Sequence, residues 1–445
     1  MGIPAFGWVG RTGSERDPGV SFNDRKKSEA SRAAYRIPFM KSLLLALGFV
    51  TSLSAADWNQ WRGPTRDGQV TSDGWPASLK GDKLKQRWKV NLSPSYSGPI
   101  VSGDLVFTTE TEEKETEIVR AFDRATGKEV WKQSWPGAMS VPFFAKANGD
   151  WIRATPACDG SSLYVAGIRD VLICLNPANG EVRWRVDFVE QFKSAVPAFG
   201  FVSSPLVDGD AVYVQAGSAV VKLNKNTGKV LWRSIEDGGG MSGSAFSSPI
   251  ISEIRGVRQV IVQTREKLAG LRLNDGKVLW EQPVEAFRGM NILTPVVYGD
   301  SVFTSTYGGT TTLFNISGDE GALRPSPAWS IKVQGYMCTP VVVNGVAYEH
   351  TKNQRTLAVD LKTGKELWTS KESFGKYWSL VANGDRILAL DQRGSLYLLR
   401  ANPAQFELID QRKVSDQETW AHLAVAGNEI YIRQLDALVA WSWED

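Results

Sequence analysis

Short apolar runs separated by turn residues recur along most of this chain. Residues 203–232 show the pattern clearly, because the turns DGD, AGS and KNTGK divide the four runs SSPLV, AVYVQ, AVVKLN and VLW. Runs of this length and β-branched composition favour strands over helices. Gly209 suits a tight hairpin, since glycine adopts a positive φ without a Cβ clash. The stretch therefore predicts a four-stranded antiparallel meander.

The first and last strands of this unit recur at regular intervals. Openings similar to SSPLV begin at residues 97, 154, 203, 247, 293, 338, 378 and 421. Closings that end in tryptophan stand at Trp88, Trp131, Trp184, Trp232, Trp280, Trp329 and Trp368. A period of about 40–50 residues with four strands per unit is typical of a β-propeller, with one unit per blade. We interpret the recurrent tryptophan as packing between neighbouring blades rather than as a ligand-stacking residue.

The two ends of the repeat predict how the ring closes. The last unit, from residue 421, supplies three strands, whereas residues 84–90 resemble a closing strand that has no unit of its own. We therefore predict an all-β, eight-bladed β-propeller of four-stranded antiparallel blades over residues 84–445, in which residues 84–90 complete the last blade. This closure leaves no free sheet edge at the seam. The seventh unit lacks the tryptophan, and Phe406 or Leu408 is expected to replace it.

Residues 1–83 do not follow the repeat. Residues 40–56 combine Met40-Lys41, a short apolar run and Ser-Ala-Ala, which is the pattern of a secretory signal peptide. The run is too short to span a bilayer, which needs about 20 residues. Residues 1–39 are interpreted as a mis-assigned or disordered leader, with Met40 as the true start. We expect residues 57–83 to form an irregular strap on the propeller, and the protein to be periplasmic or secreted.

Composition excludes some classes of function. The 51 basic and 48 acidic residues give a net charge of only +3, so no basic face of the kind that nucleic acid requires is indicated. Three cysteines are too few for a disulfide framework. Cys158 and Cys174 fall on strands two spacings apart, about 9–10 Å, so buried free thiols are expected. No transmembrane segment is predicted, and we expect a monomer.

The recurring pattern GxxxALDxxTGKxxW resembles the repeat of the pyrroloquinoline-quinone (PQQ) type propellers. It stands here as IVRAFDRATGKEVW, VLICLNPANGEVRW, AVVKLNKNTGKVLW and RTLAVDLKTGKELW. The resemblance covers nearly all of residues 84–445 and implies the propeller fold. Two functional branches share the repeat: quinoprotein dehydrogenases and the BamB type of non-enzymatic assembly scaffold. The opening WNQWRGPTRDG is similar to that of secreted PQQ-like propellers of planctomycete-type bacteria.

The resemblance implies different sites for the two branches. The dehydrogenases hold PQQ under a vicinal Cys-Cys disulfide, with a tryptophan floor and calcium bound by Asp, Glu and Asn. This sequence has no adjacent cysteines and no CxxCH haem-attachment motif, so we assign no catalytic, cofactor-binding or metal-binding residue. The assembly factors are usually lipoproteins, and the lipobox cysteine is also absent. No cofactor is expected, and PQQ and calcium belong to the alternative only.

Propeller ligands usually bind where the loops entering the first strands meet the turns between second and third strands. Twelve residues of these loops form the candidate ligand mouth: Tyr96, Trp151, Arg153, Phe201, Phe246, Arg265, Asn291, Tyr336, His350, Trp378, Trp420 and His422. Aromatic and charged side chains at one mouth suit a protein, a glycan or a small polar ligand. The same aromatics could instead plug the channel. His422 takes the Ser/Thr position of the first-strand column, which favours a satisfied core residue over a catalyst.

These observations favour a binding or scaffold module over an enzyme, because no GxSxG, HExxH or phosphate-loop motif is present. The partner would be a protein, a carbohydrate or a small polar ligand at the channel mouth. The alternative is a quinoprotein-type dehydrogenase that uses PQQ and calcium to oxidise an alcohol or sugar.

If residues 40–56 are a signal peptide, the exported protein begins at or near Asp57. N-terminal sequencing of the protein recovered from the cell envelope or the medium checks this expectation. An exported chain that begins at Met1 or Met40 contradicts the signal-peptide interpretation.

Overall fold

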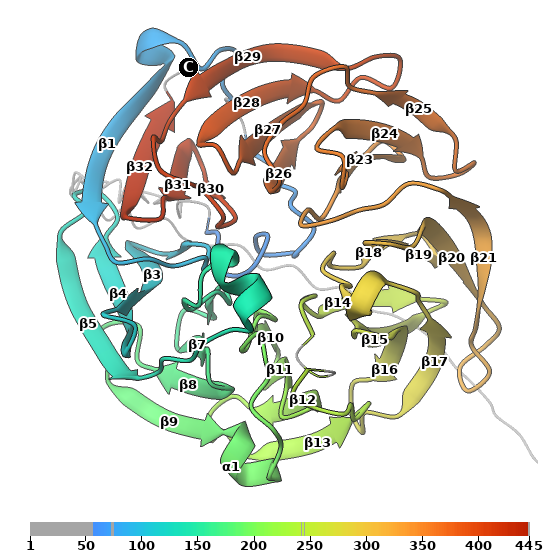
Figure 1. Cartoon of the computed structure of the whole chain (residues 1–445), viewed down its shortest axis with the longest axis horizontal. Coiled ribbons are helices and arrows are strands. Elements are labelled where there is room, and N and C mark those ends of the chain that lie inside the picture. The colour runs from blue at the N-terminus through green and yellow to red at the C-terminus, as the bar shows by residue number, and fades with distance from the viewer. Residues whose placement is uncertain (1–56, 73–74, 242, 244, 444–445) are drawn as a thin grey trace, which may run out of the picture. The chain divides into compact units, whose positions relative to one another are not determined.

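The computed structural model describes residues 57–72, 75–241, 243 and 245–443, so the predictions for residues 1–39 and 40–56 lie outside it. The described chain forms eight four-stranded sheets, arranged as blades around a central axis (Figure 1). All strand pairs within the blades are antiparallel. The predicted all-β, eight-bladed propeller is therefore confirmed. Within the described part of the chain, no helix has the length and apolar character needed to cross a membrane.

Seven blades are built from four consecutive strands, ordered from the axis outward. Blades 1 to 3 consist of β2 (Ile100–Ser102), β3 (Leu105–Glu112), β4 (Thr116–Asp123), β5 (Glu129–Pro136), β6 (Ala157–Cys158), β7 (Leu163–Gly167), β8 (Val171–Leu175), β9 (Val182–Asp187), β10 (Leu206–Asp208), β11 (Ala211–Ala216), β12 (Ala219–Asn224) and β13 (Val230–Ser234). Blades 4 and 5 consist of β14 (Ile250–Ile254), β15 (Val257–Gln263), β16 (Lys267–Arg272), β17 (Val278–Pro283), β18 (Val296–Tyr298), β19 (Ser301–Ser305), β20 (Thr311–Ser317) and β21 (Arg324–Ile331). Blades 6 and 7 consist of β22 (Val341–Val343), β23 (Val346–His350), β24 (Thr356–Asp360), β25 (Glu366–Thr369), β26 (Trp378–Asn383), β27 (Arg386–Asp391), β28 (Ser395–Arg400) and β29 (Glu407–Lys413).

The eighth blade joins the two ends of the propeller. Its inner strands are β30 (Ala424–Ala426), β31 (Glu429–Arg433) and β32 (Ala437–Trp443), and its outer strand is β1 (Leu84–Asn91). The β1–β32 ladder runs from the pair Leu84–Trp443 to the pair Asn91–Ala437. The closing strand predicted for residues 84–90 is thus confirmed. Short helical turns lie outside the blades: η1 (Gly81–Lys83), η2 (Phe143–Asn148), α1 (Phe188–Phe192) and η3 (Phe287–Gly289).

The recurrent tryptophan packs between neighbouring blades, as predicted. Trp232 of β13 donates its Nε1–H to the carbonyl of Leu273 in blade 4, at 3.0 Å. Its indole covers Gly276, where a Cβ would lie 2.7 Å from the ring and where φ is +71°, so this turn requires glycine. The same bond to the following blade is made by Trp88 to Arg124, Trp131 to Pro177, Trp184 to Lys225, Trp329 to Leu361 and Trp368 to Asn402.

The expectation that Phe406 or Leu408 replaces the tryptophan of the seventh blade is wrong. Asp410 pairs with Leu398 immediately after the β-bulge, which is the register position of Trp232 in blade 3. The buried Asp410 carboxylate accepts hydrogen bonds from the Ser78 hydroxyl at 2.5 Å and the Leu79 amide at 2.8 Å. The physical reason is the closure itself. The outer strand of the eighth blade is β1, so residues 78–79, which lead into β1, lie where other blades place a turn.

Hydroxyl groups join the innermost strands of neighbouring blades. The backbone N–H of Thr155 donates to Ser204 Oγ at 3.0 Å, and the N–H of Ser204 donates to Ser248 Oγ at 2.9 Å. Gly98 to Thr155 and Thr294 to Thr339 make the same link to the following blade, and Leu423 of blade 8 donates in the reverse direction to Ser379 of blade 7. These side chains hold the inner ring together, so most of the Ser/Thr column is structural.

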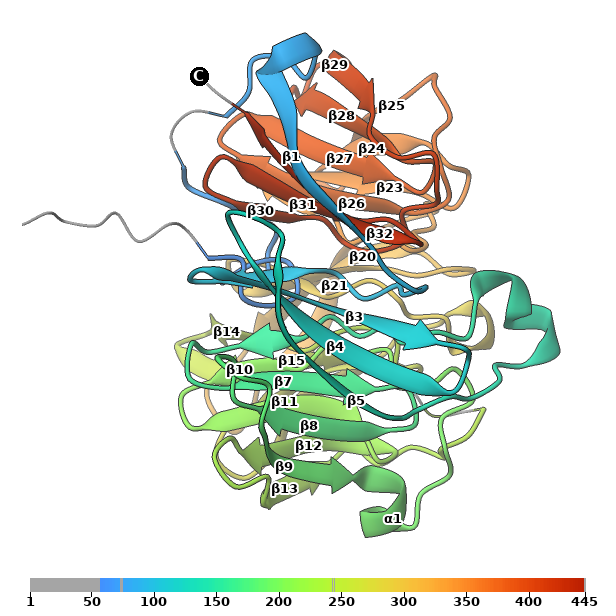
Figure 2. The same cartoon turned by 90° about the vertical axis from the view of Figure 1, so that its left-hand side faces the viewer.

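The segment 57–72 crosses one end of the central channel (blue in Figures 1 and 2). Trp58 exchanges two backbone hydrogen bonds with Val101, and its side chain is buried. The guanidinium of Arg62 donates to the carbonyl of Pro340 in blade 6, at 2.6 Å, and that of Arg66 donates to Pro205 in blade 3, at 2.8 Å. The strap therefore ties distant blades together and covers this end of the channel.

Replacing an inter-blade tryptophan should cost far more stability than replacing an aromatic residue of the channel. We expect Trp232→Ala to lower the free energy of unfolding by about 3–5 kcal/mol, because it leaves a cavity between two blades. The matched control is Trp420→Ala, since Trp420 is half-buried and lines the channel. Urea denaturation followed by circular dichroism measures both. Equal losses for the two variants contradict the inter-blade role.

Candidate functional site

A cavity of about 420 Å³ occupies the central channel. Its walls come from the loops entering the first strands, the turns between second and third strands, and the strap. Trp61 of the strap lies against His422, with ring centroids 5.1 Å apart, at the end that the strap covers. The η2 segment lies on the opposite face of the propeller from the strap (teal coil, Figure 2). Among the described residues, the strap therefore covers one end of the cavity, and η2 borders the other.

Eight of the twelve predicted mouth residues line this cavity. They are Tyr96, Arg153, Phe246, Arg265, Tyr336, Trp378, Trp420 and His422. The structure adds residues that the sequence reasoning missed, from the strap and from segments between blades. They include Trp61, Phe144, Phe199, Met241, Phe287 and Arg288. The apolar run Val141–Phe144 in a segment otherwise typical of a loop was the signal that could have indicated the η2 contribution.

The other four predicted residues lie outside the lining. Trp151 packs edge-on against Tyr96, with ring centroids 5.2 Å apart. Asn291 is buried and donates to the carbonyls of Thr264 and Arg265, at 3.2 and 3.0 Å.

The remaining two of these four, Phe201 and His350, belong to the propeller core. Phe201 is buried beside Phe188. His350 is buried, stacks on Trp378 at 5.0 Å, and has its Nε2 2.7 Å from the carbonyl of Gly375 in blade 7. These side chains are therefore structural, and His350 packs against the lining residue Trp378.

Three arcs of aromatic rings in contact line or border the cavity, and together we call them the aromatic collar. The collar consists of Tyr96, Phe144, Trp151, Phe199, Phe246, Phe287, Tyr307, Tyr336, Tyr377 and Trp420. Neighbouring ring centroids are 5.0 to 6.3 Å apart. The Arg288 guanidinium bridges two arcs of the collar, since it lies over both Phe144 and Phe287.

The charged groups in the cavity wall are all cationic. Arg265 is 8% exposed, donates to the carbonyls of Gly243 and Arg288, and lies over the ring of Phe246 at 5.0 Å. Arg153 donates to the carbonyls of Trp151 and Gly149, and burial lowers its pKa to about 10. Burial also lowers the pKa of Arg265. No Asp or Glu stands among the described residues that line the cavity.

His422 is held as a neutral core residue. Burial, together with the charge of Arg62, lowers its pKa to about 3. Its Nδ1 lies 2.8 Å from the carbonyl of Leu423, and its ring stacks with Trp58 at 6.1 Å. An imidazole in this setting is uncharged at neutral pH and contributes a polar patch to the cavity floor.

The residues present do not fit a PQQ–calcium site. Calcium is bound by several oxygen ligands, among them carboxylates, and none of the cavity-lining side chains described above is a carboxylate. In the described ranges, no cluster of three or more His, Cys, Asp and Glu side chains could hold a metal. The three cysteines are free and buried, as expected, and Cys338 lines the cavity alone. We therefore derive no redox step for this site.

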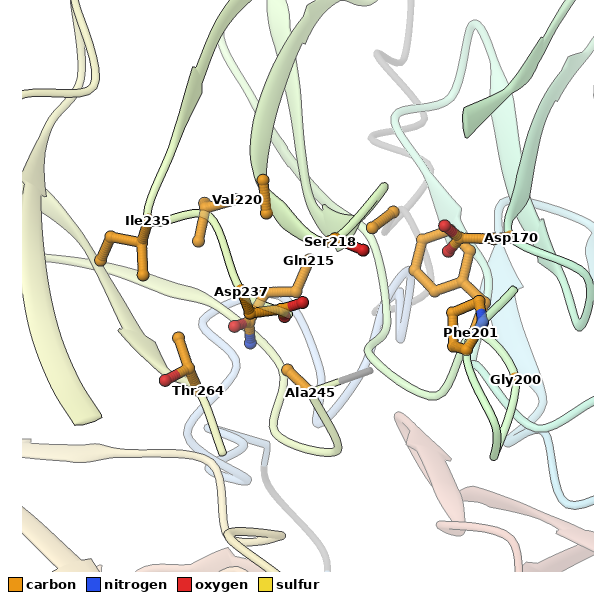
Figure 3. Close-up of a pocket in the computed structure, with 13 residues that line it drawn as sticks. Asp170, Gly200, Phe201, Gln215, Ser218, Val220, Ile235, Asp237, Ala245 and Thr264 are labelled. Carbon is orange, nitrogen blue, oxygen red and sulfur yellow. The ribbon is translucent and has the colours of Figure 1, made fainter. Parts of the chain in front are cut away.

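A second, much smaller cavity of about 10 Å³ lies beside the channel between blades 2, 3 and 4 (Figure 3). Asp170 and Phe201 line one side of it, and Gln215, Asp237 and Thr264 lie on the other. Asp170 Oδ2 accepts a 2.7 Å hydrogen bond from the amide of Gly217 in blade 3, and burial raises the Asp170 pKa to about 7. The space suits about one water molecule, so this carboxyl links two blades and offers no ligand site.

Two buried glutamates also lie at strand ends near the channel. Glu117 accepts hydrogen bonds from the indole of Trp135 at 2.7 Å and the amide of Ile168 at 2.8 Å. Neither carboxyl oxygen of Glu349 has a hydrogen-bond partner of normal geometry among the described residues. The Ser305 hydroxyl, which also contacts Thr311 at 2.6 Å, lies close enough to offset part of the effect of burial on the Glu349 pKa. Burial raises the pKa of both glutamates to about 7.

Three comparisons relate the chain to known proteins. A family model described as outer membrane protein assembly factor BamB matches residues 114–370. The outer membrane protein assembly factor BamB of Yersinia pestis is 26% identical over 260 residues, which is 56% of this chain and 63% of that protein. The crystal structure of BamB from Moraxella catarrhalis has a TM-score of 0.59 and 16% identity, and covers 81% of this chain and 98% of that chain.

A quinohemoprotein alcohol dehydrogenase from Pseudomonas putida HK5 also shares the fold. Its TM-score is 0.58 at 11% identity, and the match covers 87% of this chain and 80% of that chain. At such identities the likeness concerns the fold alone. Fold similarity therefore does not separate a scaffold from a dehydrogenase, and the residues of the cavity must do so.

The buried carboxyl of Glu349 should make stability fall as pH rises. Its folded pKa is raised to about 7 from an ordinary 4.5, so the folded state binds the proton more tightly, and stability is lost between about pH 4.5 and 7. Glu349→Gln keeps the shape and stays neutral. We expect the variant to match the wild type near pH 4.5 and to exceed it by ~3 kcal/mol at pH 8.

Urea denaturation across this pH range provides the measurement, with Glu113→Gln, a change of an exposed carboxyl, as the control. A stability difference between Glu349→Gln and the wild type that does not change with pH contradicts the assignment.

Proposed function

The chain belongs to the family of the outer membrane protein assembly factor BamB, and from this membership we propose that it is a protein-binding scaffold in outer membrane protein assembly. The proposal places the protein in the periplasm, where the predicted signal peptide would deliver it. It assigns the propeller the task of presenting a docking surface, without a chemical step.

The observation that carries the proposal is an exposed apolar surface around the open mouth, which we call the mouth patch. It consists of Phe143, Phe144, Met241 and Phe287, which are 84%, 49%, 52% and 51% exposed. They come from η2, the segment before β14, and η3, three separate parts of the chain. Contiguous exposed apolar groups on a protein surface mark interaction sites, and aromatic residues and methionine are enriched at protein interfaces.

The other exposed apolar side chains have a repetitive, structural explanation. Val130, Val182, Leu231, Val278 and Leu408 all lie in the outermost strands, spread around the circumference. The mouth patch differs because its members lie outside the repeat and cluster at one face. This contrast favours a partner at the mouth over one at the rim.

A quinoprotein-type dehydrogenase is not favoured. The described wall of the cavity offers cations where calcium would need carboxylates. A glycan has no specific support either, because no feature of the mouth distinguishes a sugar from an apolar protein segment.

Disrupting the mouth patch should abolish partner binding. In the native host, deleting the gene should lower the amount of outer membrane proteins. Cross-linking in the cell envelope should join the wild-type protein to a component of the outer membrane assembly machinery. We expect Phe144→Asp and Phe287→Asp to reduce this cross-link at least about tenfold, the effect of losing an interface hot spot.

The matched control is Leu231→Asp, since Leu231 is 49% exposed on outer strand β13. Its cross-link should equal that of the wild type. Unchanged outer membrane protein levels after deletion, or mouth variants that bind as the wild type does, overturn the proposal.

A further inference from the structure

The cavity behind the mouth patch has the size and enclosure of a small-molecule site. Its volume of about 420 Å³ lies within the range of about 300–1,000 Å³ typical of ligand pockets. Trp61 of the strap and His422 contact each other at its inner end, and we expect a ligand to enter from the η2 side. A protein docked on the rim leaves this inner space unexplained.

Arg265 is the side chain in this wall that is best positioned to receive an anion. Its guanidinium has five N–H donors, and the structure uses two of them, toward the carbonyls of Gly243 and Arg288. The guanidinium packs over Phe199 and Phe246, and its central carbon, Cζ, lies 5.6 and 5.0 Å from the two ring centroids. These contacts fix the guanidinium before any ligand arrives, and a pre-positioned guanidinium suits bidentate binding of a carboxylate.

The positive charge of this wall has no direct counter-ion. Among the ion pairs of the described chain, none includes Arg153, Arg265 or Arg288. Asp237 and Glu266 act on Arg265 only at longer range. A buried charge without a partner is costly, so an anionic ligand would gain from compensating it.

Apolar side chains lie beside the Arg265 guanidinium. The rings of Phe199 and Phe246 meet at 5.4 Å beside Arg265, and Met290 and Ile292 line the same cavity. An anion of purely polar character, such as a free phosphate, would leave these groups uncovered. The wall is matched to a molecule that has one acidic group and an apolar body.

We propose that the channel cavity binds a small amphipathic carboxylate, whose acidic group pairs with Arg265 and whose apolar body lies within the aromatic collar. This site is additional to the protein-docking function and does not depend on the partner. The carboxylate belongs to a small single-chain or aromatic acid, and binding of an acidic peptide in its place is an outcome that the tests below distinguish.

Three ligands with the same ten-carbon chain test the proposal on the full protein. Isothermal titration calorimetry would compare decanoate, decan-1-ol and decyltrimethylammonium, each below its aggregation concentration. We expect one decanoate per protein, bound about tenfold more tightly than decan-1-ol, and no preference for the cation. Raising the salt concentration should weaken decanoate binding and leave decan-1-ol binding unchanged. This comparison uses the unaltered protein and does not depend on the folding of any variant.

Variants then locate the acidic group. Arg265→Gln should lower decanoate affinity about tenfold and remove its advantage over decan-1-ol, whereas Phe199→Ala should weaken both. The control Arg258→Gln changes an exposed arginine that pairs with Asp208 on the outer surface, and should bind as the wild type. Circular dichroism verifies that each variant is folded.

Three results overturn the proposal. One is equal binding of the carboxylate and the alcohol, and another is loss of the preference in Arg153→Gln but not in Arg265→Gln. The third is that a short acidic peptide with apolar side chains, titrated in the same way, binds while decanoate does not. Because none of these measurements involves the assembly partner, their failure leaves the protein-docking proposal standing, and failure of docking leaves this one standing.

Discussion

The pairing of β1 with β32 is the constraint on which the rest of this structure depends. Without β1 the eighth blade would have only three strands and would expose β32 as its outer edge, and exposed edges invite aggregation. Here the outer strand of the last blade comes from the beginning of the repeat, in a continuous ladder from Leu84–Trp443 to Asn91–Ala437. The same closure brings residues 78–79 to Asp410 and the strap to the channel end. The segment that precedes the closing strand therefore also covers one end of the channel.

The repeated residues of this propeller serve the contacts between blades. Indole N–H groups donate to the next blade on the outside, and Ser/Thr hydroxyls accept from the preceding blade on the inside. Buried polar groups at strand ends, such as Asp170 toward Gly217, do the same between these layers. Residues that recur in every blade are needed everywhere for the same reason, and so they say little about a ligand. The features that distinguish this protein lie in the strap, η2 and η3, which interrupt the repeat.

Charge at the mouth is set by local arrangement, because the net charge of +3 is close to zero for 445 residues. The cavity wall gathers Arg153, Arg265 and Arg288, while the buried acids Glu117, Asp170 and Glu349 lie behind it with raised pKa values. The arginines face the cavity with their full positive charge, whereas the raised pKa values reduce the negative charge of the three acids. The opening is therefore positive. A positive, aromatic opening suits a molecule that has an acidic group and an apolar body. It does not suit calcium, which requires carboxylate ligands.

The sequence by itself determined the fold, the number of blades and the closing strand, because a period-2 pattern with regular turns can be satisfied by few architectures. It also indicated eight residues of the cavity wall, since repeat position places every loop at a known end of the channel. It failed at Asp410, because the residue at this position hydrogen-bonds to Leu79, which is 331 positions away in the chain. It also missed Phe144, Phe199 and Phe287, which lie in segments outside the repeat. Only the tertiary structure decided where those segments fold, because their positions depend on contacts between blades distant in sequence and not on local pattern.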